Sequence, residues 1–182
     1  MNKPIIVGKN IILTHSGIYF DFVDPKPDMI RIEDIAHALA HTCRFGGHCS
    51  KFYSVAQHSV ITASLVPEEL RLTALLHDAP EAYLGDVVKP LKKMLPDYNQ
   101  IEERIQKLVL TTLGAVYPLP EEVHAADLGM LKWEQRDIMK NQDDWPSVRD
   151  VVMPYYGKHS LTPWSVEVSK GMFLETYSCL SK

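Results

Sequence analysis

The sequence lacks several features that would decide its class at once. Its three cysteines, Cys43, Cys49 and Cys179, are an odd number and include no Cys-x-x-Cys pair. This argues against a disulfide framework and against a thiolate zinc site. Basic residues are not in excess, because 19 lysines and arginines stand against 23 aspartates and glutamates, for a net charge of −4. Duplex DNA or RNA is therefore not expected as a partner, since non-specific binding of either depends on a basic surplus.

Long apolar runs are missing as well. No window approaches the roughly 18 apolar residues of a membrane-spanning helix, and the first ten residues, MNKPIIVGKN, show no apolar run behind the first lysine. We therefore expect a soluble protein of a reducing bacterial or phage-infected host cytosol, with no membrane contact. With 182 residues, of which 46% are apolar, the chain fits one globular domain spanning residues 1–182.

Hydrophobic periodicity predicts a mostly helical chain. Apolar residues recur at helical spacing over residues 32–43, 55–65, 67–78, 101–114, 121–139 and 166–180. Near the N-terminus, alternating apolar and polar residues around a Ser16-Gly17 turn predict a β-hairpin over residues 10–23. Residues 140–163, rich in proline, aspartate and aromatics, are expected to be irregular. The predicted fold class is an all-α bundle with a small N-terminal β-hairpin.

The stretch ALLHDAPEAYLGD ends an apolar helix with a cluster of titratable side chains. His77 and Asp78 are adjacent, and Glu81 follows four residues after the histidine. Removing such a cluster from water is costly unless each member has a partner, and a metal ion is the simplest partner. The best further ligands on other helices are His58 in SVAQHSV and Asp127 in AADLG. Two imidazoles and two carboxylates suit zinc, cobalt, manganese or iron, and the ligand types do not choose among these metals.

Other histidines carry weaker signals. His37 and His41 have the i, i+4 spacing of a metal pair, but they lie about 150° from the apolar stripe of their helix and are expected to be exposed. His48, beside Gly46-Gly47, is a candidate to line the site or to bind a second metal.

The order His58, His77-Asp78, Asp127 on successive helices resembles the H…HD…D signature of HD-domain metal-dependent phosphohydrolases. The segments HDAPEAYLGDVVKPLK, AADLGML, RFGGH and FYSVAQHS are similar to the branch that contains YfbR-like 5'-deoxynucleotidases and phage dATP triphosphohydrolases of the DatZ type. The resemblance covers residues 28–135. It implies an HD-domain helical bundle in which these four residues bind a divalent zinc, cobalt or manganese ion.

The resemblance also implies roles for residues around the ligands. Glu81 and Asp86, from the trailing Glu-x-x-x-x-Asp, would be catalytic, and would orient the metal-bound water or carry its proton. Arg44, Phe45 and Lys51 would bind the substrate: the two basic residues would offset phosphate charge, and the phenylalanine stands where YfbR-like proteins have tryptophan. Family members commonly form dimers or rings, so a homo-oligomer is expected.

The expected function is hydrolysis of a small-molecule deoxynucleotide. The first hypothesis is a dATP triphosphohydrolase that releases deoxynucleoside and triphosphate, and the alternative is a 5'-deoxynucleotidase acting on monophosphates. A second class, a catalytically idle HD domain that senses nucleotides, would have no chemical need for Glu81 and Asp86. A cyclic-dinucleotide phosphodiesterase is disfavoured because HDAPE is not HDxGK and no later GYP follows. The aromatic residues of the C-terminal third could form an apolar subunit interface; they are Trp145, Tyr155, Tyr156 and Trp164.

Overall fold

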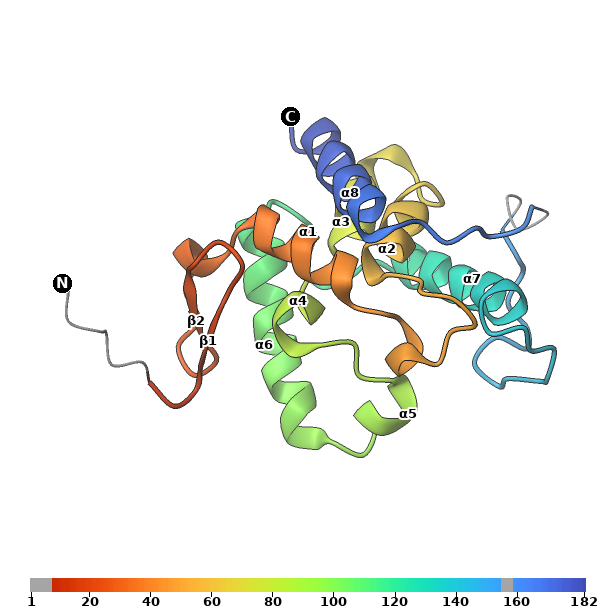
Figure 1. Ribbon diagram of the computed structural model, residues 1–182, viewed down its shortest axis with the longest axis horizontal. Helices are drawn as coiled ribbons and strands as arrows, with labels where there is room; N and C mark the ends of the chain where they lie inside the picture. The colour runs from red at the N-terminus through yellow and green to blue at the C-terminus, as the bar shows by residue number, and fades with distance from the viewer. Residues whose placement is uncertain (1–7, 155–158) are drawn as a thin grey trace.

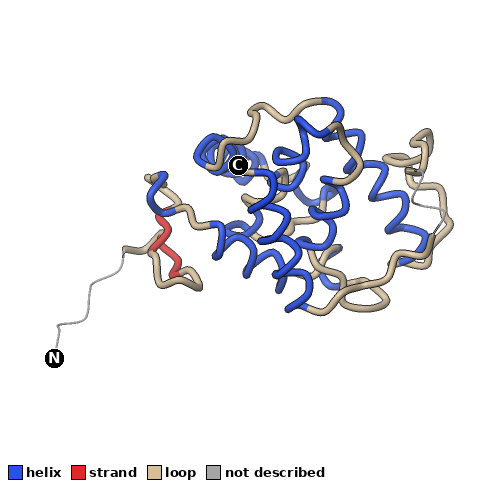
Figure 2. Tube along the Cα trace, turned by 90° about the horizontal axis from the view of Figure 1, so that it is seen from above, coloured by secondary structure: helices blue, strands red, loops and turns tan. Residues whose placement is uncertain are grey.

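The computed structural model describes residues 8–154 and 159–182, and this part of the chain is mostly helical with one small antiparallel sheet (Figures 1 and 2). The predicted Tyr155 and Tyr156 lie outside the described residues. The elements, in chain order, are β1 Ile11–Leu13, β2 Tyr19–Asp21, α1 Ile32–His41, α2 Val55–Ala63, α3 Arg71–Leu76, α4 Glu81–Leu84, α5 Lys89–Lys92, α6 Pro96–Thr112, α7 Glu121–Asp137 and α8 Val166–Leu180. The predicted mainly helical class with an N-terminal hairpin is confirmed.

The hairpin lies at one end of the molecule, on the opposite side of the helical body from α7 (Figure 1). Gly17 adopts a φ of 86°, which the connecting turn requires and which glycine tolerates best. Phe20 on β2 is fully buried and stacks on Tyr83 with ring centroids 4.1 Å apart. Asp34, in the first turn of α1, accepts hydrogen bonds from Thr14 Oγ1 (2.8 Å) and from Ser16 N (2.6 Å) and Oγ (2.7 Å). Both the core and a polar anchor therefore fix the hairpin to α1.

The core forms where α1, α2, α3 and α8 pack together. The buried face of α1 contacts α2, α4 and α8, and α2 also contacts α3 and α7. A second, smaller apolar cluster lies around α7 and the segment that follows it; its members are Tyr53, Met130, Trp133, Ile138 and Leu161. Because α2 packs against both α3 and α7, a buried side chain on α2 can lie between those two helices.

Two helix boundaries differ from the sequence prediction. The helix predicted from residue 101 begins at Pro96, because proline fits the first helical position, where its missing N–H is not needed. The helix predicted to carry His77 and Asp78 ends at Leu76, with His77 as its cap, and Glu81 begins a separate short helix, α4. A 3₁₀ turn, Glu68–Leu70, precedes α3 after Pro67. Within the described residues, no helix has both the length and the apolar character needed to cross a lipid bilayer.

Candidate metal centre

His58 is oriented by the helix that carries it and by a buried carboxylate. Ser54 caps α2 by accepting a hydrogen bond from Gln57 N at 3.1 Å. The His58 side chain is fully buried, and its Nδ1 lies 2.6 Å from Glu134 Oε1. An ionised carboxylate accepts only, so in the neutral ring Nδ1 carries the proton and Nε2 presents its lone pair on the other side of the ring. This tautomer is the one a metal-binding histidine needs.

His77 is oriented in the same way by a backbone group. It caps the C-terminal end of α3, and its Nδ1 donates to the carbonyl oxygen of Ala74 at 2.7 Å. The lone pair of its Nε2 is therefore free to bind an ion. The two Nε2 atoms of His58 and His77 lie 3.3 Å apart.

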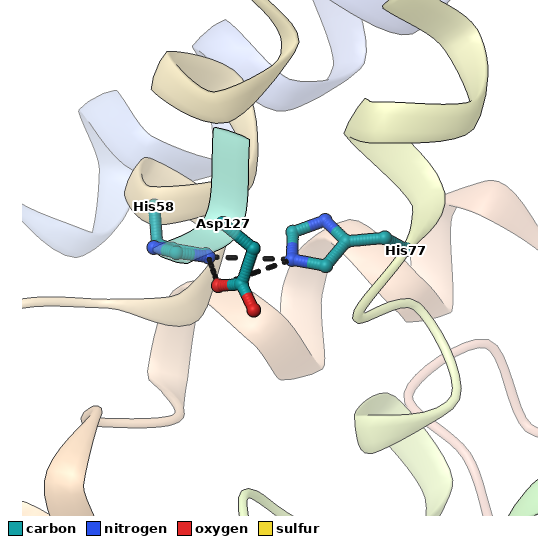
Figure 3. Close-up of side chains that lie close together, drawn as sticks. All are labelled: His58, His77 and Asp127. Carbon is teal, nitrogen blue, oxygen red and sulfur yellow. Dashed lines mark hydrogen bonds and ion pairs between the residues drawn. The ribbon is translucent and has the colours of Figure 1, made fainter. Parts of the chain in front are cut away.

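Two carboxylates complete a compact set of donor atoms. Asp127 Oδ1, from α7, lies 3.2 Å from His58 Nε2 and 3.9 Å from His77 Nε2. Figure 3 shows the two imidazoles and this carboxylate facing one another from three different elements, and together they could hold a metal ion. Asp78 Oδ2 lies 3.3 Å from His77 Nε2 and 3.6 Å from His58 Nε2.

The spacing of these donors fits a divalent ion. Ligand atoms at zinc-bond lengths from a tetrahedral centre are about 3.4 Å apart, and the donor pairs given above are separated by 3.2 to 3.9 Å. The structure thus brings three of the four predicted ligands, His58, His77 and Asp127, close enough to hold a metal ion. Asp78, the fourth, lies beside both histidines. The chemistry of these donors leaves the metal's identity open.

The electrostatics of the cluster favour a cation at its centre. Burial and the charge of Arg44 lower the pKa of His58, but Glu134 and Asp127 outweigh them and raise it to about 9. Burial raises the pKa of Asp78, but the two histidines and Arg44 outweigh it and hold this pKa far below its ordinary value. The anionic surroundings of the two histidines thus favour positive charge at the centre of the cluster.

Glu134 is the important residue that the sequence analysis missed. Besides accepting from His58, its Oε2 accepts from Arg44 Nε (3.2 Å) and Nη2 (3.1 Å), and its side chain is fully buried. The available signal was its place two helical turns after Asp127 on α7, which puts both residues on the same face. Nothing in the local sequence distinguishes it from an exposed glutamate of the same helix.

Arg44, predicted to contact substrate, lies within this network. Its Nη1 lies 3.3 Å from Asp78 Oδ2, and the rest of the guanidinium faces Glu134, so the arginine links a metal ligand to the carboxylate behind His58. Its side chain is only 11% exposed. A contact of Arg44 with substrate phosphate stays a prediction.

Glu81, predicted as catalytic, is the first residue of α4, and Asp86, also predicted as catalytic, follows the glycine that ends this helix. Glu81 is buried, its Oε1 is 3.6 Å from Lys92 Nζ, and its Oε2 has no hydrogen-bond partner among the described residues. Burial and the charges of Asp78 and Asp86 raise the pKa of Glu81 well above 4.5. Asp86 is half-buried, and burial is the main cause that raises its pKa.

The other predicted residues lie on one loop. Phe45 is half-buried, while Lys51 and His48 are exposed, and none of the three belongs to the donor cluster of His58, His77 and Asp127. Phe45 has a φ of 56°, which is unusual for a bulky residue.

His37 and His41, which the sequence predicts to be exposed, lie outside the donor cluster and next to His15 of the hairpin. His15 stacks on His37 with centroids 3.6 Å apart, and His37 lies 4.1 Å from His41. The expected exposure is right for His41 and wrong for His37, which is half-buried because the hairpin covers it.

Comparisons with known proteins find close relatives of unassigned activity. The chain is 40% identical over 174 residues to the uncharacterized protein YfdR of Escherichia coli (strain K12), a match that covers 95% of this chain and 97% of that protein. It is 39% identical over 137 residues to an uncharacterized protein of Rhodobacter capsulatus, covering 68% and 70% of the two chains. No family model matches the chain.

Proposed function

We propose that this chain, which belongs to the family of the Escherichia coli protein YfdR, is a metal-dependent phosphohydrolase of deoxynucleotides with an HD-domain bundle. The observation that carries the proposal is the convergence of His58, His77 and Asp127 from three elements, with Asp78 beside both histidines. Glu81, three residues after Asp78, is buried, and its Oε2 has no hydrogen-bond partner among the described residues. A purely structural ion pair would need neither feature.

A bound divalent ion would supply an activated water and polarise a phosphoryl oxygen. His58, His77, Asp78 and Asp127 would hold that ion. Glu134 and the Ala74 carbonyl keep both histidines in the tautomer that presents Nε2. Arg44 keeps Asp78 and Glu134 ionised, because its guanidinium contacts both carboxylates.

The chain's own acids account for the proton that hydrolysis must move. Water oxygen bonds to phosphorus, the bond from phosphorus to the 5' oxygen breaks, and that oxygen takes up a proton. Glu81, whose pKa is raised well above 4.5 by burial and by Asp78 and Asp86, is able to carry this proton at its unpaired Oε2. Lys51, exposed on the loop after Arg44, would attract the phosphates.

We propose dATP as the substrate, with deoxyadenosine and triphosphate as the products. The test is a product assay on protein loaded in turn with zinc, cobalt and manganese, offering each deoxynucleotide as mono- and triphosphate. Release of intact triphosphate supports the proposal. Release of orthophosphate from monophosphates alone identifies a 5'-deoxynucleotidase instead, and no turnover with any metal contradicts a phosphohydrolase and leaves a nucleotide sensor.

Two variants show whether the activity belongs to this site. Asp127→Asn removes a charged ligand and should abolish turnover. His124→Gln changes an exposed histidine on the same helix and should leave turnover unchanged. Equal activity in the two variants would show that the hydrolysis comes from elsewhere.

A further inference from the structure

Two loops meet near the C-terminal end of α7 (Figure 1). One is the loop after α1, which carries Phe45, and the other follows α7 and carries Trp145. The two rings make an edge-on contact, with centroids 6.3 Å apart and an interplanar angle of 60°. Ser50 N donates to the Ile138 carbonyl at 3.0 Å and joins the two loops. Trp145, one of the aromatic residues that could form a subunit interface, packs its ring against Phe45 of the predicted substrate loop.

This aromatic pair directly adjoins the ion-pair network of the metal centre. Phe45 follows Arg44, and the Arg44 guanidinium carbon lies 5.5 Å from the centre of the Phe45 ring. The same guanidinium reaches Asp78 Oδ2 at 3.3 Å. A ligand with its phosphate at the metal centre would therefore have its organic part near these rings.

The structure fixes the backbone at Phe45 and the loop that carries Trp145. Phe45 keeps a positive φ, which persists in a bulky residue only where the surroundings impose it. The loop of Trp145 is tied to α7 by Gln135 Nε2, which donates to the Asp143 carbonyl at 2.7 Å. Arg149 pairs with Asp144 on the same loop. Backbone strain clusters at functional sites, and ligand-binding surfaces are usually largely preformed. The strained Phe45 and the hydrogen-bonded loop of Trp145 fit such a surface.

We infer that Trp145 extends onto a second loop the substrate surface that the resemblance assigns to Phe45, and that Trp145 binds the nucleobase there; this inference rests on the proposed deoxynucleotide substrate. Both side chains are half-buried, so part of each ring faces solvent. Aromatic faces stack on bases of every kind, and purines offer the larger face. The second loop thus contributes a specificity-determining residue, Trp145, that lies outside the segment bearing the metal ligands.

The test uses tryptophan fluorescence with deoxyadenosine as the probe. Deoxyadenosine is a product of both hydrolytic reactions considered above, so the metal-loaded protein cannot turn it over. The matched probe, 2-deoxyribose, lacks the base. We expect deoxyadenosine, and not 2-deoxyribose, to change the emission of the wild-type protein. Trp145→Ala should weaken deoxyadenosine binding about tenfold, the order expected from loss of one base-stacking contact.

Conservative variants keep the test decisive. Trp145→Phe should retain most of the affinity, measured by calorimetry, while the emission change disappears. Trp164→Phe, a half-buried tryptophan before α8, should keep both the affinity and the emission change. Phe45→Leu provides a second measurement, expected to weaken binding, if Trp145→Ala does not fold.

The outcomes separate this inference from the proposed function. Base-dependent binding through Trp145 in a protein that hydrolyses no deoxynucleotide would support the base surface and contradict the phosphohydrolase. Turnover in a protein whose Trp145→Ala variant binds deoxyadenosine as tightly as wild type would overturn the base surface alone. Equal binding of deoxyadenosine and 2-deoxyribose by the wild type would also overturn it.

Discussion

Glu134→Gln tests how far the metal centre depends on a residue that touches no metal. Glutamine has nearly the same shape, but it replaces a charged acceptor of His58 Nδ1 by a neutral one and removes the partner of Arg44 Nε and Nη2. Hydrogen-bonding partners behind a metal ligand are worth about 10- to 100-fold in metal affinity. We expect Glu134→Gln to weaken zinc and cobalt binding by about 30-fold, within that range.

The same variant should also destabilise the protein. Arg44 stays buried, and its remaining ion-pair contact is with Asp78. Removing one partner of a buried pair costs about 3 to 5 kcal/mol, and because glutamine still accepts hydrogen bonds we expect about 2 kcal/mol less stability for the metal-free protein. Thermal melts of the wild type and of Glu134→Gln are therefore measured first. Metal affinity is then measured at a temperature at which both proteins are folded.

The assay is competition between the protein and a chromophoric chelator for cobalt or zinc. Glu121→Gln, an exposed glutamate on the same helix, is the control and should bind metal like the wild type. If Glu134→Gln is folded and binds metal within twofold of wild type, Glu134 does not set the tautomer of His58. The reasoning from that hydrogen bond would then be refuted.

Three further outcomes are expected around the hairpin. Asp34→Ala removes its three anchoring hydrogen bonds and should lower the free energy of unfolding by about 2 kcal/mol in urea, whereas the exposed Asp24→Ala should leave it unchanged. Phe20→Ala empties a fully buried site and should cost about 4 kcal/mol, measured in the same way. Burial and the neighbouring histidines lower the pKa of His37, so its neutral form is favoured in the folded state. The contribution of neutral His37 to stability is thus full above the ordinary pKa of 6.5 and is lost as the pH falls below that value. Below this pH, amide hydrogen exchange of residues 10–23 should become faster relative to exchange in α7. An unchanged ratio of the two exchange rates would contradict this.

The helices were predictable because their apolar residues repeat at helical spacing. Residues 121–139 were predicted and α7 spans Glu121–Asp137, and the predicted helix at residues 55–65 corresponds to α2, Val55–Ala63. The break between His77 and Glu81 was not predictable from spacing, because an i, i+4 pair fits a continuous helix equally well. Tertiary packing of α4 against α1 accompanies the new helix start.

The donors of the metal centre could be selected from sequence because each combines a ligand side chain with an apolar context. Glu134 and Asp34 could not, because their partners lie 76 and 18 to 20 residues away in the chain. The stacking of His15 on His37 was invisible for the same reason, since it depends on where the hairpin docks. Long-range pairing is information that local periodicity does not contain.

The donors come from α2, from the residues after α3 and from α7, elements that are far apart in sequence. An ion bound to all of them would act as a non-covalent cross-link that only the folded chain can form. Each tenfold rise of free metal above the dissociation constant would then add about 1.4 kcal/mol to the free energy of unfolding. The lifetime of the protein against proteases would follow the metal supply of the cell, so that starvation for the metal would lower the amount of protein as well as its occupancy.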